Sequence, residues 1–169
     1  MKQSDFLNTV MPFKDKIFRL AKRLLVSTEE AEDATQELFF KLWKNKEKLN
    51  EYKSIEAFAM TMTKNYCFDR LKSKQASNLT LVHSNYTEKG ASLQKRVELN
   101  DSVSLVEKLI DKLPEQQKLI IQLRDIEQYE FEEIAEMLQI KQTAIRVSLS
   151  RARKTIREQL IKQHQYGIS

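Results

Sequence analysis

The stretch FEEIAEMLQIKQTAIRVSLSRARKTIREQL, residues 131–160, decides the fold class of this 169-residue chain. Its apolar residues recur every three or four positions from one end to the other, which is the spacing of one face of an α-helix. The sign of its charge changes along the stretch: the first part is acidic and the last part is basic. Helical spacing with segregated charge predicts two amphipathic helices, the second with a surface suited to a polyanion.

Two helices with a short turn between them are predicted in this stretch. The apolar face of the first, over residues 131–138, consists of Phe131, Ile134, Ala135 and Leu138. The apolar face of the second, over residues 142–160, consists of Ile145, Leu149, Ala152, Ile156 and Leu160. This arrangement is typical of a helix-turn-helix. Gln139 stands where the turn often has Gly, so we expect a strained backbone or a slightly different turn there.

The side of the second helix opposite its apolar face carries the candidate DNA contacts. The first half of a recognition helix normally enters the major groove, so contact with base edges is predicted for Thr143, Arg146, Val147 and Ser150. The bases predicted to contact phosphates are Arg151, Arg153, Lys154 and Arg157. The acids of the preceding helix would have to face away from the duplex. A solvated, charged helix that binds no DNA remains the alternative.

The rest of the chain also favours helices. Only two Gly and two Pro occur among 169 residues, which leaves few of the turns that sheets need, so we expect an all-α protein. Apolar spacing predicts one helix over residues 6–24 that begins or bends near Pro12. Ser27 and Glu30 form a capping-box pattern that predicts a second helix over residues 28–43. A third is predicted over residues 55–74, with a core face of Phe58, Met62, Cys67 and Leu71.

Residues 76–104 lose the apolar spacing and gather Ser, Asn and Thr, so they are predicted to form a linker. We therefore expect two small helical domains, over residues 1–75 and 105–169. In the second domain, helices are predicted from about residue 105, over residues 115–125 after Pro114, and in the opening stretch. Charge is segregated in two acidic-then-basic cycles. Residues 27–40 hold five acids and no Lys or Arg, and residues 41–75 hold nine bases and four acids; residues 105–140 hold nine acids and four bases, and residues 141–169 hold seven bases and one acid.

Several classes of protein are disfavoured. A single cysteine, Cys67, excludes an internal disulfide and fits a reducing compartment. The N-terminus lacks the apolar core of a signal peptide, and no run approaches the roughly 18 apolar residues of a membrane span, so a cytoplasmic protein is expected. No metal, nucleophile or phosphate-loop pattern is visible, so we expect neither an enzyme nor a cofactor. A net charge of +5 is compatible with nucleic acid.

Two segments, AEDATQELFFKLW at residues 31–43 and LRDIEQYEFEEIAEMLQIKQTAIRVSLSRARKTIRE at residues 123–158, resemble bacterial sigma factors of the extracytoplasmic-function (ECF) group. Regions 2 and 4 of that family are matched in order. The resemblance implies a subunit that binds core RNA polymerase and directs it to promoters, region 2 engaging the −10 element and region 4 the −35 element. It also implies polymerase contact by Asp33, Gln36 and Glu37, which share one helix face.

The family pattern around the −10 element is matched by Lys64, Asn65, Asp69, Arg70, Lys72 and Lys74. By resemblance, Asn65 would read an unpaired promoter base and the basic residues would hold the strand, as single strands are held in positively charged grooves. A simple surface pair of Asn65 with Asp69 remains the alternative. The chain departs from the family where Gln128 and Gln139 replace Gly and where Ala144 replaces Thr.

The resemblance implies three partners: core RNA polymerase, promoter DNA and an inhibitory anti-sigma factor that is often membrane-anchored. No small-molecule substrate is implied. Two other functions stay open. A helix-turn-helix regulator that acts without polymerase leaves the match at residues 31–43 unexplained, and a purely protein-binding adaptor leaves the basic helix face unexplained.

Overall fold

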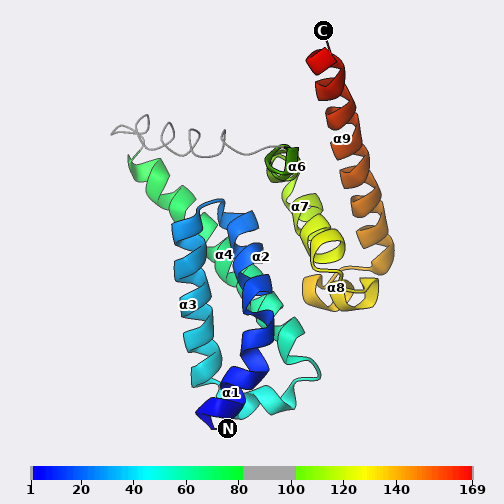
Figure 1. Ribbon diagram of the computed structural model, residues 1–169. Coiled ribbons are helices and arrows are strands. Elements are labelled where there is room, and N and C mark those ends of the chain that lie inside the picture. The colour runs from blue at the N-terminus through cyan, green and yellow to red at the C-terminus, as the bar shows by residue number, and fades with distance from the viewer. Residues whose placement is uncertain (1, 82–101, 169) are drawn as a thin grey trace.

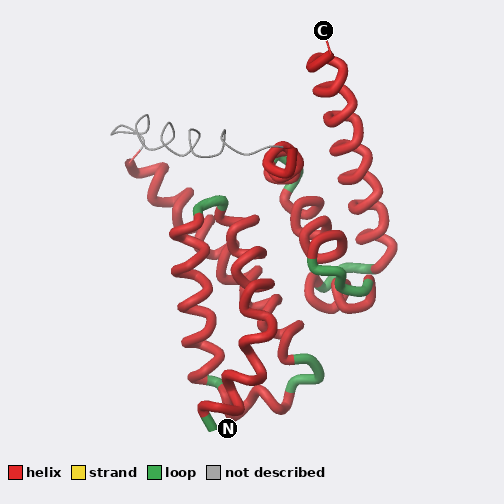
Figure 2. Tube along the Cα trace, viewed as in Figure 1, coloured by secondary structure: helices red, strands yellow, loops and turns green. Residues whose placement is uncertain are grey.

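The computed structural model describes residues 2–81 and 102–168. Within these ranges the chain forms helices and short turns and contains no strand, which confirms the all-α prediction (Figure 2). The helices form two bundles, one from each range (Figure 1). Most of the linker predicted over residues 76–104 lies outside the described residues. None of the described helices is long and apolar enough to cross a membrane.

The N-terminal bundle contains α1 (Gln3–Val10), the 3-10 turn η1 (Met11–Phe13), α2 (Lys14–Leu25), α3 (Thr28–Lys44), the 3-10 turn η2 (Lys46–Glu51) and α4 (Ile55–Leu81). The helix predicted over residues 6–24 is interrupted at Pro12, whose ring and missing N–H disfavour a continuous α-helix. Ser27 caps α3 as predicted, because its Oγ accepts a hydrogen bond from the backbone N of Glu30 at 3.3 Å.

Helix α2 packs against both α3 and α4, which also contact each other. Its predicted apolar positions are all buried: Ile17, Leu20, Ala21 and Leu24. The core face of α4 was predicted only in part. Its fully buried side chains are those of Ala59, Met60, Thr63 and Cys67, whereas those of Phe58, Met62 and Leu71 are half-buried at the edge of the core.

Thr63 explains why that face was missed. Its hydroxyl lies in the core but donates a hydrogen bond to the backbone O of Ala59 at 2.7 Å, so no polar group is left unpaired. The small side chain of Ala59 lets the neighbouring helices approach α4 closely. A prediction that selects only large apolar side chains therefore places the core face slightly to one side of its true position.

The C-terminal bundle contains α6 (Ser102–Asp111), α7 (Glu115–Ile121), a π-helical turn η3 (Gln122–Ile126), α8 (Phe131–Leu138) and α9 (Gln142–Ile168). Helix α8 has the predicted bounds. Helices α4 and α9 extend further than predicted, by about two turns each. The residues added to each helix are mostly polar in sequence, so apolar spacing gave no signal for them.

Three residues other than Gly have left-handed backbone in the described part of the chain: Val26 at φ 66°, Gln128 at φ 64° and Gln139 at φ 55°. Gln139 ends α8 and turns the chain toward α9. It adopts the left-handed conformation that Gly usually takes at such a turn, so the turn keeps its usual geometry and the strain expected at this residue is present. Its side-chain Nε2 donates a hydrogen bond to the backbone O of Glu136 at 2.7 Å. That bond partly offsets the steric cost of a Cβ in this conformation.

The two bundles contact each other. Helix α2 packs against α7 and η3, and α4 packs against α8. The buried apolar side chains of both bundles belong to one continuous cluster. Packed apolar side chains, as well as polar contacts, therefore define the position of one bundle relative to the other.

Candidate nucleic-acid interface

Helix α9 presents the predicted outward row to solvent. Ile145, Leu149 and Ala152 are buried and hold the helix against α7 and α8. The side chains predicted to contact base edges are all exposed: Thr143, Arg146, Val147 and Ser150. Those of Arg151, Lys154 and Arg157 are exposed further along the same helix. The geometry therefore brings seven of the eight predicted region 4 contacts to one accessible surface.

The eighth, Arg153, has a protein partner. Its guanidinium forms two hydrogen bonds to the carboxylate of Asp125 in η3, with 3.0 Å between Nε and Oδ2. Hydrogen bonding to that carboxylate raises the pKa of Arg153. The ion pair joins α9 to the π-helical turn and competes with any phosphate for the same side chain.

An aromatic ring supports the guanidinium at the centre of the outward row. Arg146 lies with its guanidinium carbon 5.3 Å from the ring centroid of Phe131, and Arg124 lies 4.4 Å from the same ring. Such cation–π contacts favour particular orientations of an otherwise flexible side chain. Phe131 was predicted only as a core residue, and its half-exposed ring has this second role in placing Arg146.

Helix α4 exposes only some of the residues predicted for the −10 element. Asn65, Asp69, Lys72 and Lys74 are exposed. Lys74 forms an ion pair with Glu30 of α3. Arg70 donates a hydrogen bond from Nη1 to the hydroxyl of Tyr66 at 3.3 Å.

Lys64 differs most from its predicted environment. Its Nζ donates a hydrogen bond to the backbone O of Met137 in α8, at 3.2 Å, so the C-terminal bundle covers it. Burial lowers the pKa of Lys64. This contact joins residues that are far apart in sequence, and no local pattern predicts it.

Next to this part of α4 lies an aromatic pair that was not predicted as part of the site. The rings of Tyr52 and Phe58 stack with their centroids 3.9 Å apart, and Tyr52 remains exposed. Ser54 caps the start of α4 by accepting a hydrogen bond from the backbone N of Ala57 at 3.1 Å, which fixes the loop that carries Tyr52. Exposed aromatic rings beside basic residues are typical of single-strand binding, and that combination in the sequence was the available signal.

Helix α3 exposes the three residues predicted for polymerase contact. Asp33, Gln36 and Glu37 point to solvent, while Ala34 and Leu38 on the opposite side are buried. Phe40 continues the exposed face with 51% of its surface accessible, and Lys44 lies 4.6 Å from its ring centroid. Phe40 was not predicted as part of this surface, because an aromatic residue on an amphipathic helix is more often buried.

The described residues contain no group of three or more His, Cys, Asp or Glu side chains placed to hold a metal ion.

Comparison with known families matches both bundles. The family model described as Sigma-70 region 2 matches residues 9–77, and the one described as Sigma-70, region 4, matches residues 104–156. The ECF sigma factor SigW of Bacillus subtilis is 26% identical over 94% of this chain and 90% of its own length. The ECF sigma-E factor of Escherichia coli is 26% identical over 91% of this chain and 85% of its own. The chain belongs to the ECF sigma factors.

The fold of the sigma factor is also found among solved structures. Its similarity to the sigma factor RpoE of Bartonella quintana, solved in complex with the anti-sigma factor NepR, has a TM-score of 0.77 over 92% of this chain and 96% of that one, at 17% identity. The N-terminal bundle of the sigma factor is thus region 2, which carries the exposed faces of α3 and α4. The C-terminal bundle is region 4, which carries the outward row of α9.

Proposed function

We propose that this sigma factor binds core RNA polymerase and directs transcription from specific promoters, with region 2 at the −10 element and region 4 at the −35 element. We assign region 2 to residues 1–75, the linker to residues 76–104 and region 4 to residues 105–169. The observation that carries the proposal is the presence, in one chain with both family regions, of an exposed acidic and amide face on α3 and an exposed basic row on α9.

Region 4 would read duplex DNA through α9. Thr143, Arg146, Val147 and Ser150 would meet base edges in the major groove, and an arginine can bond two acceptors of a guanine at once. Arg151, Lys154 and Arg157 would neutralise phosphates. Arg153 would remain with Asp125, because a phosphate would have to displace a carboxylate that already accepts two hydrogen bonds.

Region 2 would engage the opened −10 element through α4 and the loop before it. Asn65 and Asp69 are exposed and could form hydrogen bonds with an unpaired base, while Lys64, Arg70, Lys72 and Lys74 would contribute positive charge near the strand. Asp33, Gln36 and Glu37 of α3 would contact the polymerase. They form a polar face that no described basic side chain is seen to neutralise.

The family supports two further parts of the proposal. An anti-sigma factor would bind the chain and inhibit it, a partner of the same kind as NepR, with which the similar RpoE of Bartonella quintana forms a complex. The chain would act in the cytoplasm as a non-catalytic subunit, and the polymerase would supply catalysis.

The test is transcription in vitro with core polymerase on a library of random promoter sequences. The proposal predicts that adding the chain produces transcripts whose templates share two conserved elements upstream of the start. Folded protein that binds neither polymerase nor any promoter contradicts it. If the chain binds duplex DNA tightly without polymerase, and adding polymerase does not change that affinity, the helix-turn-helix regulator is favoured instead.

A further inference from the structure

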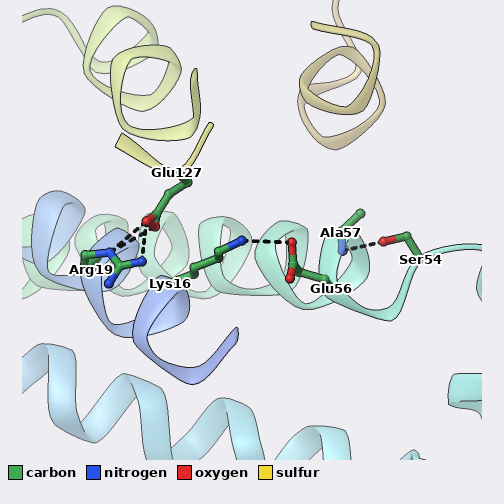
Figure 3. Close-up of polar contacts among 6 residues, drawn as sticks. All are labelled: Lys16, Arg19, Ser54, Glu56, Ala57 and Glu127. Carbon is green, nitrogen blue, oxygen red and sulfur yellow. Dashed lines mark hydrogen bonds and ion pairs between the residues drawn. The ribbon is translucent and has the colours of Figure 1, made fainter. Parts of the chain in front are cut away.

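An ion pair between a partly exposed arginine and a buried carboxylate joins region 2 to region 4. Arg19 of α2 donates a hydrogen bond from Nε to Oε1 of Glu127 at 2.7 Å, and its Nη2 lies 2.6 Å from the same carboxylate (Figure 3). The Glu127 side chain is 0% exposed, so this carboxylate has exchanged water for the guanidinium. Hydrogen bonding to Glu127 raises the pKa of Arg19. A buried carboxylate left without its partner is costly, so this pair strongly favours the arrangement that buries it.

One helical turn further along α2, Arg23 contacts region 4 at three points. Its Nε donates to the side-chain oxygen of the buried Gln122 at 2.9 Å, and its Nη1 pairs with Asp111 at 2.9 Å and donates to the backbone O of Glu107 at 3.3 Å. Arg23 is itself nearly buried. Arg19 and Arg23, at i and i+4, thus form one face of α2 that is devoted to region 4.

Tyr129 extends this contact toward α4. Its ring is buried at the interface, with Nζ of Lys16 5.1 Å from the ring centroid. Lys16 also pairs with Glu56 at the start of α4, at 3.4 Å (Figure 3). Burial raises the pKa of the Tyr129 hydroxyl, and the neighbouring carboxylate of Glu56 raises it further. The contact therefore extends from α2 to the edge of the −10 face.

Helix α8 of region 4 lies over that face. Met137 accepts the hydrogen bond of Lys64. Beside this contact, an open groove of about 990 Å³ has Tyr52, Lys53, Phe58 and Thr61 of region 2 on one side. On the other side it is lined by three acids of α8, namely Glu132, Glu133 and Glu136.

We propose that region 4 is the intramolecular occupant of the Lys64 end of the −10 face of region 2: α8 covers this end in the free sigma factor, and the contacts of Arg19 with Glu127 and of Arg23 with η3 and α6 hold the closed state. The inference rests on the proposed function, which gives α4 its role at the −10 element. The acids of α8, which must face away from the −35 duplex, then act here as a negatively charged cover for a surface that binds a polyanion.

Two properties of the closed state follow. To reach Lys64, a single strand would have to displace α8 and pass three carboxylates that repel its phosphates, so the closed state and full engagement of the −10 face by the strand exclude each other. The polymerase face of α3 stays exposed, as does the outward row of α9. Polymerase can therefore dock on the closed protein, whereas the −10 strand binds only the open fraction, and its apparent Kd is raised in proportion.

The closed state is tested first by a distance measurement on the full chain. Spin labels are placed on Thr28→Cys in α3 and Glu158→Cys in α9, both exposed positions. Cys67 is buried and stays unlabelled, because burial raises its pKa to about 12 and the thiolate is the reactive form. The parent should give one narrow distance distribution. Arg19→Glu should broaden and lengthen it, Arg19→Glu with Glu127→Arg should restore it, and the exposed control Lys14→Glu should leave it unchanged.

The covering of the −10 face is tested with a fluorescein-labelled oligothymidine of about 12 nucleotides. Arg19→Glu and Glu127→Arg change the net charge in opposite directions, so charge alone would weaken binding in the first and strengthen it in the second. Opening of the −10 face strengthens binding in both. Substituting Lys64 and Asn65 with Ala in each variant should abolish the gain.

Three results would overturn the inference: a parent distribution as broad as that of Arg19→Glu, affinities that follow net charge alone, or a gain that survives the loss of Lys64 and Asn65. Circular dichroism of each variant shows whether its helices remain folded. Transcription by the parent with core polymerase is unaffected by these results, so the proposed function can hold while this inference fails.

Discussion

Arg153 of α9 and Asp125 of the π-helical turn form a two-point ion pair, with 3.0 Å between Nε and Oδ2. Both side chains are partly exposed, 54% and 33%, so solvent screens the pair and its contribution to stability is at most about 1 kcal/mol. Its main effect is on position, because it draws one arginine of the basic helix away from the outward row and toward η3.

Asp125→Ala should release Arg153 for phosphate contact. Affinity for −35 duplexes should then rise on all sequences alike, and the slope of log K against log salt concentration should steepen by about one unit. Fluorescence anisotropy at several salt concentrations measures both quantities. Arg153→Ala in the parent should change affinity little; a loss equal to that of Lys154→Ala would mean that Arg153 binds phosphate in spite of Asp125.

Arg146→Ala should weaken binding to the preferred −35 duplex by about 1–3 kcal/mol and relax specificity at one base pair, as expected for loss of a bidentate base contact. Lys154→Ala is the matched control on the same helix and should weaken binding equally on every sequence. Binding to a library of −35 variants, read by sequencing, separates the two effects. A uniform loss in both variants would assign Arg146 to the phosphates.

Gln36→Ala combined with Glu37→Ala should weaken binding to core polymerase, by roughly 1–3 kcal/mol if these side chains lie near the centre of the interface. Both are exposed on α3, so the free energy of unfolding should change little. The exposed acid Glu51, outside this face, is the control for a mere change of charge. Equal polymerase affinity for the double variant and the parent would refute the assignment of α3.

Leu149→Ala should lower the free energy of unfolding by about 2–5 kcal/mol, because it leaves a cavity between α9 and the rest of region 4. Val147→Ala, two residues earlier and exposed, should change it by no more than about 0.5 kcal/mol. Chemical denaturation followed by circular dichroism compares the pair. If the two variants lose similar free energies of unfolding, the buried face of α9 is not the one that contains Leu149.

Val26→Gly should stabilise region 2. Val26 ends α2 with φ 66° while 59% of its surface is exposed, so its β-branched side chain is strained and packs little. Removing the strain stabilises the folded state, whereas the greater backbone freedom of Gly stabilises the unfolded state. The free energy of unfolding should rise by about 1 kcal/mol after both effects, which corresponds to a rise in Tm of roughly 2–4 °C. Gln139→Gly should gain less, since it also loses the hydrogen bond to Glu136. A lower Tm for Val26→Gly would contradict strain at this position.

Local patterns in the sequence predicted the elements they encode directly. The 3.6-residue spacing located α8 and the buried face of α9 at Ile145, Leu149 and Ala152, because burial of those side chains is what stabilises each helix. The capping pattern located the start of α3 at Ser27. The resemblance identified the outward residues of α3, which the structure exposes as an acidic and amide face.

Contacts between distant residues could not be predicted in this way. Arg19 and Glu127 are 108 positions apart, and each read locally as an ordinary surface charge. Only the packing of α2 against η3 makes them partners. The same holds for Lys64 and Met137, and for Arg153 with Asp125, where the π-helical turn sets the direction of the carboxylate. The last turns of α4 and α9 were missed because their mostly polar sequence carries no apolar spacing.

The burial of Cys67 affects which stresses this chain can sense by itself. It is the single thiol of the protein, and with a pKa near 12 it is almost entirely protonated at neutral pH. Peroxides and electrophiles attack thiolates, so they find no reactive thiol in the folded sigma factor. A signal that acts through thiol oxidation would therefore have to enter through another molecule, and this chain would serve as its readout and not as its detector.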